Sequence, residues 1–170
     1  MVRKDSKMAY TRLYDLLPEL ALAETSLVEI GPINAYHLPA GEYGLVEMYC
    51  DDENCDCRRV FIAVMLNEPD AREPLAVIAF GWESLRFYTK WYNFGRNTPF
   101  SKMDEISQYS ILRMRGACLN NFSPQSDLAP AILKMLKKIV FQDEFYVNRL
   151  KDHYKQFRAK VDEGYRLSHR

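Results

Sequence analysis

The stretch 47-EMYCDDENCDCRRVFIAV-64 places three of the four cysteines of this 170-residue chain within eight positions. The residues on either side, 43–49 and 60–66, are rich in β-branched and aromatic side chains and predict two β-strands. Strands joined by so short a connection pair as an antiparallel hairpin. With the first strand ending at Cys50 and the second starting near Cys57, the hairpin loop would bring three sulfur atoms toward one point.

The sequence after the hairpin predicts a further strand, and the sequence before it predicts a helix and a loop. A third strand is predicted over residues 75–82, after the turn-rich segment NEPDAREP at 67–74. Before the hairpin, the apolar spacing over residues 8–17 predicts a short amphipathic helix that stops near Pro18. The glycine and prolines that follow indicate a loop after Ile30.

After the third strand, the apolar residues recur with the period of a helix. The segment ESLRFYTKWYNFG at 83–95 predicts a short helix that is closed by its final glycine. Residues 100–121 fit either a helix or a strand. A further helix is predicted within 123–141, and Pro130 delays its start to near residues 128–129.

The last helix has the clearest pattern in the chain. Asp143 can cap its first turn. His153 lies on the rim of its apolar stripe, about 60° around the helix axis from Leu150, so its ring is expected to face other protein. The stripe comprises Tyr146, Leu150, Tyr154, Phe157 and Val161.

These elements predict an α+β fold, in which a short antiparallel β-meander of about three strands is packed by C-terminal helices and preceded by a short N-terminal helix. The length suits a single domain, 1–170. Within it we expect an N-terminal helix and loop at 1–38, the sheet with its cysteine loop at 39–82, and a helical part at 83–162.

The composition restricts the partners. With 23 basic and 23 acidic residues, the chain lacks the basic excess of a non-specific nucleic-acid binder, so nucleic acid is not an expected partner. The run RFYTKWYNFGR at 86–96 could stack bases, but its aromatic residues fit the core side of one helix better. A signal peptide and a long apolar span are both missing, which predicts a cytoplasmic protein without a membrane segment.

Clustered thiols in a reducing compartment are more often metal ligands than disulfides. A structural zinc site needs four ligands, so Cys50, Cys55 and Cys57 would need one more. We predict His153 as that ligand, because it stands on a rigid helix. The other candidates are Cys118, His37, a loop carboxylate or water.

Such a site would tie the first hairpin to the last helix and stabilise the fold. The predicted cofactor is therefore zinc. The predicted function is metal binding in a binding or interaction module, with a protein partner left open. The four acids in the loop should raise the pKa values of the thiols, which would make the metal-free loop poorly nucleophilic.

Several alternatives stay open. The spacing comes one residue short of the CxxxxCxxC run of plant-type ferredoxins, with Cys118 as the remote cysteine, so an iron–sulfur or redox protein is the second reading. The cysteines could also be small residues at strand ends without a ligand. A calcium loop is rejected, because the glycine and distal glutamate of an EF-hand are missing.

The common enzyme motifs HExxH, GxSxG and GxxxxGK are absent from the sequence, so an enzyme is the less favoured reading. A zinc enzyme with an open coordination position, and with Asp51 or Asp52 as its base, stays an alternative.

The motifs YxxVExYC at 43–50 and CDCRRVFI at 55–62, a PQS-led helix and RLKDHYKQF at 149–157 together carry a resemblance. The chain resembles an uncharacterised bacterial protein family that is sometimes attached to a SEC-C zinc-binding tail, over roughly residues 39–161. No cysteine follows Cys118, so nothing of that tail's function carries over. The resemblance implies no activity, but it points to the same three cysteines and to His153.

Overall fold

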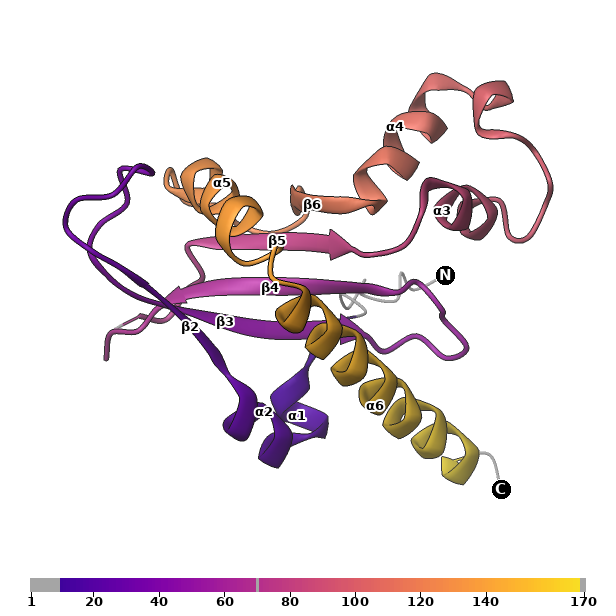
Figure 1. The fold of residues 1–170 in the computed structure, drawn as a ribbon. Coiled ribbons are helices and arrows are strands. Elements are labelled where there is room, and N and C mark those ends of the chain that lie inside the picture. The colour runs from indigo at the N-terminus through magenta and orange to yellow at the C-terminus, as the bar shows by residue number, and fades with distance from the viewer. Residues whose placement is uncertain (1–9, 70, 169–170) are drawn as a thin grey trace, which may run out of the picture.

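Figure 1 shows a computed structural model, which describes residues 10–69 and 71–168. One antiparallel sheet forms its centre, and β3 and β4 are the two strands predicted around the cysteine loop. Their many β-branched and aromatic residues suit a pleated surface that is buried on both sides. The six strands are β1 (Tyr10–Arg12), β2 (Ser26–Ile30), β3 (Gly41–Cys50), β4 (Arg59–Leu66), β5 (Ala76–Gly81) and β6 (Gly116–Leu119).

The sheet has the order β1-β3-β4-β5-β6, and β2 also pairs with β3. The ten residues of β3 are long enough to pair with both short N-terminal strands along one edge. Tyr10 lies opposite Cys50 at one end, and Ile30 lies opposite Gly41 at the other. This arrangement places β1 beside the start of the cysteine loop.

The α+β class and the meander β3-β4-β5 were predicted, but a sheet of about three strands understates the structure. Strands β1 and β2 lie in the part expected to be helix and loop, and β6 lies in the part expected to be helical. These strands are three to five residues long, and such short strands carry too few residues for a visible period of two. Pairing with longer neighbours is what makes them strands.

The helices confirm most of the C-terminal predictions. Helix α3 (Leu85–Tyr92) is followed by Gly95 at φ 81°, α5 (Ala129–Ile139) has Pro130 in its first turn, and α6 (Glu144–Ser168) follows Asp143. The Asp143 carboxylate accepts a hydrogen bond from the Phe145 amide at 2.9 Å. The ambiguous segment 100–121 contains the short 3-10 helix η1 (Phe100–Lys102), helix α4 (Glu105–Met114) and then β6.

The N-terminal helix differs from the prediction. Met8 and the residues before Tyr10 lie outside the described residues. Two short helices follow β1, α1 (Leu13–Leu16) and α2 (Pro18–Glu24), so Pro18 begins a helix rather than ending one. Proline is well tolerated in a first helical turn, because its missing N–H has no partner there in any case.

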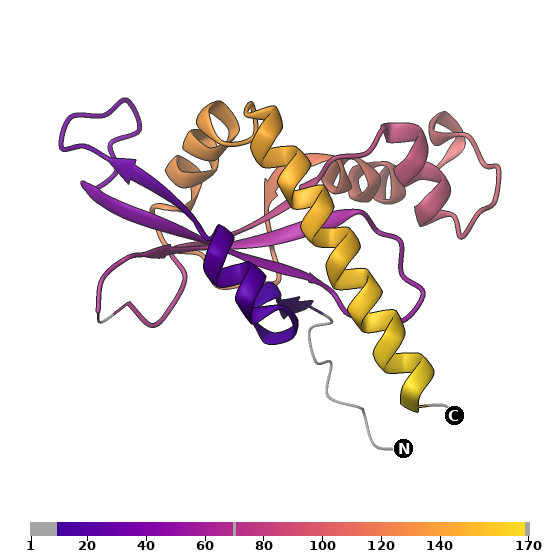
Figure 2. The ribbon, with the colours of Figure 1, turned by 60° about the horizontal axis from the view of Figure 1, so that its bottom comes forward.

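The two faces of the sheet are packed differently. On the face that we call the core face, side chains such as Tyr43, Ile62 and Ile78 pack against α5 and α6, which cross it in Figures 1 and 2. The opposite face, here the second face, has a smaller buried cluster of Phe61, Ala63, Val77 and Ala79. Within the described part of the chain, no helix has the length and apolar character needed to cross a membrane.

Candidate metal centre

The cysteine loop begins where β3 ends on the second face of the sheet. Met48 packs with the second-face cluster, and Cys50 follows it by two residues and so points to the same side. The loop turns tightly, because the Cys55 amide donates to the Asp52 carbonyl at 3.3 Å and Asn54 takes a left-handed φ of 57°. Asparagine tolerates that conformation better than most residues.

This turn brings the three predicted sulfur atoms together. The Sγ atoms of Cys50, Cys55 and Cys57 all lie within 4.8 Å of one another, and all three cysteines are free. Cys50 and Cys57 are buried and Cys55 is half-buried. In a tetrahedral zinc site with Zn–S bonds of about 2.3 Å, neighbouring sulfurs lie about 3.8 Å apart. The cluster can therefore hold a metal ion.

The three thiols also influence one another's protonation. Hydrogen bonds with Cys50 and Cys57 lower the pKa of Cys55, and hydrogen bonds with Cys50 and Cys55 raise the pKa of Cys57. For Cys55, the two thiol donors outweigh the burial that by itself would raise its pKa. The expectation that every thiol in the metal-free loop has a raised pKa is therefore wrong for Cys55.

Helix α6 holds the loop from the core face. The Arg158 guanidinium donates from Nη1 to the backbone carbonyls of Cys50 and Asp52, both at 2.9 Å. The Tyr154 hydroxyl accepts a hydrogen bond from the Arg58 amide at 3.3 Å and donates to Asp56 at 3.5 Å. Hydrogen bonds therefore join the hairpin to the last helix, and the predicted connection through zinc and His153 stays a prediction.

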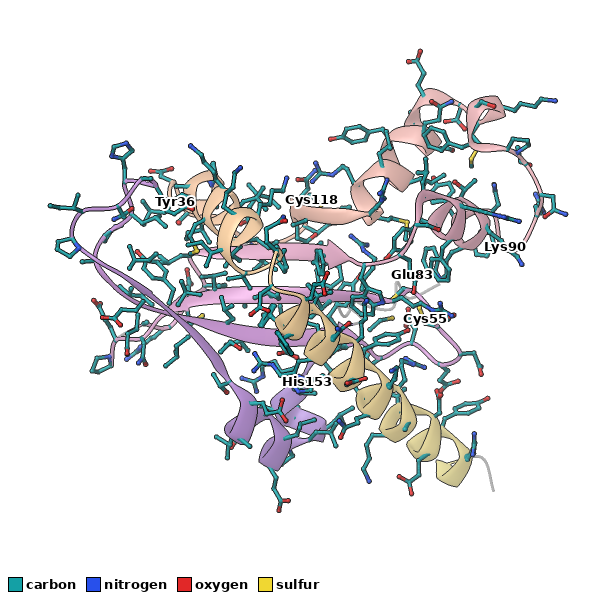
Figure 3. All side chains as sticks on the ribbon, in the orientation of Figure 1. Tyr36, Cys55, Glu83, Lys90, Cys118 and His153 are labelled. Atoms are coloured by element: carbon teal, nitrogen blue, oxygen red, sulfur yellow. The ribbon has the colours of Figure 1, made fainter. Side chains whose placement is uncertain are left out.

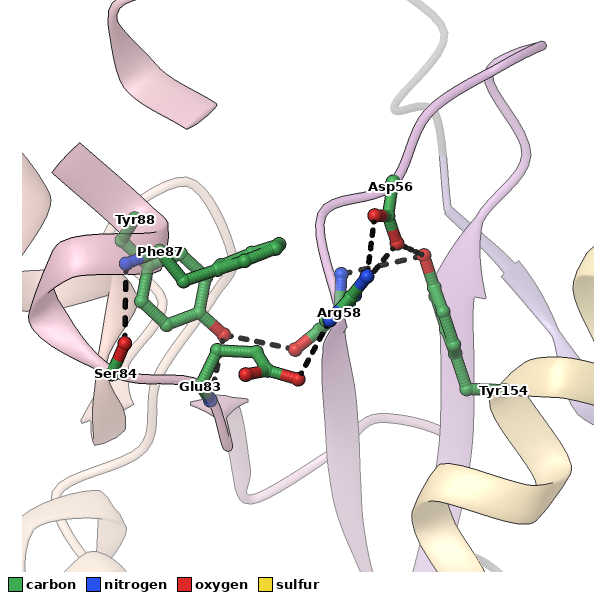
Figure 4. A network of polar contacts seen from close by, with 7 residues as sticks. All are labelled: Asp56, Arg58, Glu83, Ser84, Phe87, Tyr88 and Tyr154. Carbon is green, nitrogen blue, oxygen red and sulfur yellow. Dashed lines mark hydrogen bonds and ion pairs between the residues drawn. The ribbon is translucent and has the colours of Figure 1, made fainter. Parts of the chain in front are cut away.

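Arg58 links the other side of the loop to the start of α3, as Figure 4 shows. Its guanidinium pairs with Asp56 at 2.9 Å and with Glu83 at 3.1 Å, and it lies over the Phe87 ring at 4.6 Å. The Tyr88 hydroxyl donates to the Arg58 carbonyl at 2.9 Å. Arg58 has a φ of 48°, a strained value for a residue with a Cβ, and these contacts hold it there.

His153 lies elsewhere, within the core-face packing. Its Nδ1 lies 2.8 Å from Glu47 Oε2 and its Nε2 lies 3.0 Å from Glu24 Oε2. Figure 3 shows His153 and Cys55 at separate places on the molecule. With both ring nitrogens bonded to carboxylates, His153 would have to leave one of them to bind a metal, so its role as fourth ligand stays a prediction.

Burial by itself lowers the pKa of His153, but hydrogen bonds and charge from Glu47 and Glu24 outweigh it and the net shift is upward. The Tyr49 hydroxyl donates to the same Glu47 oxygen at 2.7 Å. These contacts join β3, α2 and α6, and the His153 and Glu47 side chains are buried whereas Glu24 is partly exposed.

The structure also keeps Cys118 and His37 apart from the three sulfur atoms. Cys118 lies on β6, and its thiol donates to the Arg113 carbonyl at 3.2 Å. Strand β6 lies two strand spacings, about 10 Å, from β4. His37 precedes the opposite end of β3, about 30 Å along the strand from Cys50. Asp52 is an exposed residue in the same loop as the cluster, and desolvation, the charge of Cys50 and a hydrogen bond with Cys50 raise the pKa of its carboxyl group. Its carboxylate is not among the ligand atoms that lie within 4.8 Å of one another.

Two buried charged residues were missed in the sequence: Glu47, which is bonded to His153, and Arg158, which is bonded to the cysteine loop. Glu47 occupies a core-face position of β3 between Leu45 and Tyr49. A charged residue at an otherwise apolar position of a strand indicates a buried partner, so this signal could have been read from the sequence. Arg158 is 9% exposed and follows the stripe residue Phe157 directly. Its place on the helix gave no comparable signal, because an arginine at a stripe edge is ordinarily solvated.

Comparisons of the chain with protein-family models, with curated proteins and with solved structures found no match. The family resemblance described above is therefore still a prediction, and the geometry of the site carries the functional argument.

Proposed function

We propose that Cys50, Cys55 and Cys57 bind a zinc ion and that the chain is a metal-binding protein in which this ion is structural. The observation that carries the proposal is the approach of three free sulfur atoms to within 4.8 Å of one another in a single loop. Thiolates are preferred ligands of zinc, and a reducing compartment such as the cytoplasm would keep them available.

A structural role is favoured because the loop is restrained on both sides before any metal is considered. Arg158 and Tyr154 bind it from α6, and Arg58 joins it to α3. A preorganised ligand set lowers the entropy that ordering would otherwise cost when the ion binds. The bound ion would then stabilise the end of the hairpin, which is in contact with both α6 and α3.

For the fourth position, we propose the Asp52 carboxylate in preference to His153. Asp52 follows Cys50 by two residues in the same loop, so a small movement of its side chain can bring it to the ion, whereas His153 is bonded to two glutamates. A carboxylate can complete a thiolate site with a Zn–O bond of about 2.0 to 2.2 Å.

The experiment is elemental analysis of protein purified without a metal-affinity tag. We expect about one zinc per chain, lost when Cys50, Cys55 or Cys57 is replaced by serine. Cys118→Ser is the matched control and should retain the metal. Iron with visible absorption would support an iron–sulfur cluster instead, and protein without stoichiometric metal would contradict the proposal.

Two further variants identify the fourth ligand. Asp52→Asn should weaken zinc retention against a chelator, on the order of tenfold or more, because a charged ligand is lost. His153→Gln should leave zinc retention unchanged, because the ring of the original His153 is bonded to the glutamates. Loss of zinc in His153→Gln, with Asp52→Asn unaffected, would restore the histidine as the ligand.

A further inference from the structure

The second face of the sheet contains a cavity of about 400 Å³ that the metal proposal does not use. Its floor is formed by Phe61 of β4 and Ala79 of β5, and Cys118 of β6 lies at one side. Tyr109 of α4 and Phe122, which follows β6, stand at its mouth and are 58% and 89% exposed. Its volume lies within the range of small-molecule sites in proteins.

The charge of the cavity is uniformly positive. Arg59 and Arg113 both line it, and none of the described residues in its wall is acidic. Neither guanidinium forms an ion pair with any residue within 10–69 or 71–168. Two partly buried cations without a counter-charge favour an anion between them.

The hydrogen bonding of Arg59 points the same way. Its Nε is buried and has no hydrogen-bond partner, and its Nη2 reaches the Arg113 carbonyl only at 3.4 Å. A buried donor without a partner is costly, so such groups in native proteins commonly serve water or a ligand. Arg113 is better satisfied, since its Nη2 donates to the Leu119 carbonyl at 2.7 Å and to Asn121 at 3.0 Å. Those bonds hold its guanidinium beside the cavity.

Aromatic rings supply the remaining walls. The Tyr10 and Phe61 rings are in contact, with centroids 3.8 Å apart. Arg59 lies over Phe61 at 5.2 Å, and Arg113 lies over Tyr109 at 5.6 Å. Rings that already accept a guanidinium on one side are suited to stack on a flat ligand as well.

We propose that this cavity binds a small organic anion, a planar aromatic ring that carries one phosphate or carboxylate group. The oxyanion would lie between Arg59 and Arg113 and would accept hydrogen bonds from their guanidinium groups. The ring would lie among Tyr10, Tyr109 and Phe122. The positive charge, the unpartnered donor and the aromatic walls each favour one part of this ligand.

The cavity adjoins the cysteine loop without depending on its metal. Tyr10 pairs with Cys50 across β1 and β3, and Arg59 follows Cys57 by two residues. The cluster cysteines do not line the cavity. A ligand here would therefore bind beside the proposed zinc, and loss of either site leaves the other testable.

The test is isothermal titration calorimetry of the full chain with two pairs of probes. Adenosine 5′-monophosphate and adenosine test the phosphate, and 4-hydroxybenzoate and 4-hydroxybenzamide test the carboxylate. We expect at least one anion to bind with a Kd below about 1 mM and its neutral partner to bind on the order of tenfold more weakly. The anion that binds more tightly identifies the oxyanion.

Variants then assign the binding to this cavity. Arg59→Gln and Arg113→Gln should each weaken binding on the order of tenfold. Phe122→Ala removes a largely exposed ring and should weaken binding without a cost in folding. Arg86→Gln is the matched control, because it removes the same charge from the exposed surface of α3, outside this cavity, and should bind as the original chain does.

Three results would overturn the proposal. The first is that neither anion binds. The second is that the neutral probes bind as well as the anions. The third is that binding persists unchanged in Arg59→Gln and Phe122→Ala, whose circular dichroism spectra would establish that they are folded.

Discussion

The two faces of the sheet differ in how they are packed and in which polar groups they leave without partners. The core face packs one large apolar cluster against α5 and α6, and two of its buried polar residues, Glu47 and His153, are bonded to each other. The second face has a buried cluster of four residues, the cysteine loop at one end and a cavity with an unpartnered arginine nitrogen. Stability is concentrated on one face, and the chemistry that could bind ligands is concentrated on the other.

This difference follows from what each face leaves unsatisfied. The core face is densely packed, and among its buried polar atoms the Tyr146 hydroxyl lacks a hydrogen-bond partner in the described part of the chain, so it offers a ligand few groups. On the second face, the three thiols are free and Arg59 Nε has no hydrogen-bond partner within residues 10–69 and 71–168, so a bound ion or ligand would stabilise these groups. Substitutions on the two faces should therefore have different costs.

The largest effect is expected from His153→Ala. The change leaves the Glu47 carboxylate, which is 5% exposed, without its counter-charge inside the core face. Breaking a buried pair in this way should lower the free energy of unfolding by about 4 kcal/mol. Urea denaturation measures it, and Glu47→Gln combined with His153→Gln should cost less because no unpaired charge is left. A loss below about 1 kcal/mol would contradict a stabilising role for the pair.

A cavity placed on each face compares them directly. Leu150 is fully buried between α6 and the core face, so Leu150→Ala should cost about 3 kcal/mol. Met48 is half-buried on the second face, and Met48→Ala should cost about 1 kcal/mol. Equal costs in urea denaturation would mean that the second face is packed as tightly as the core face.

At Gly81, residues of α3 and α4 pack closely against the second face of the sheet. A Cβ at this position would lie 1.9 Å from the Met114 carbonyl oxygen and 2.4 Å from the Tyr88 hydroxyl. Gly81→Ala should therefore cost about 2 kcal/mol through overpacking. Gly164 has open space around it on α6, and Gly164→Ala should stabilise the fold by about 0.5 kcal/mol in the same thermal or urea melts. A neutral Gly81→Ala would show that α3 and α4 can move away from the sheet.

The smallest effect is the pH dependence of the His153 pair. In the folded protein, the pKa of His153 is raised above its usual value of 6.5. The contribution of the pair to the free energy of unfolding is therefore fully present below the pKa that His153 has in the unfolded chain. That contribution is lost as the pH rises through the folded pKa. Urea unfolding from pH 6 upward should therefore show a decline that is absent from His153→Gln. The same decline in both proteins would assign it to other groups, the thiols included.

Sequence patterns predicted the parts of the fold that depend on near neighbours. The hairpin β3-β4, the third strand, the helices near α3 and α5 and the stripe of α6 all follow from periodicity, capping and proline placement. The grouping of Cys50, Cys55 and Cys57 follows as well, because a hairpin loop closes on itself within a few residues. These features needed only local geometry.

Only the tertiary structure decided which distant residues meet. The strands β1, β2 and β6 exist through pairing with longer neighbours, and their own sequences are too short to predict them. His153 meets Glu47 and Glu24, while Arg158 of the same helix reaches the cysteine loop. The two residues stand five positions apart, and the packing angle of α6 on the sheet sets which partner each one reaches. Periodicity gives the face of a helix, but only the packed structure gives what lies opposite it.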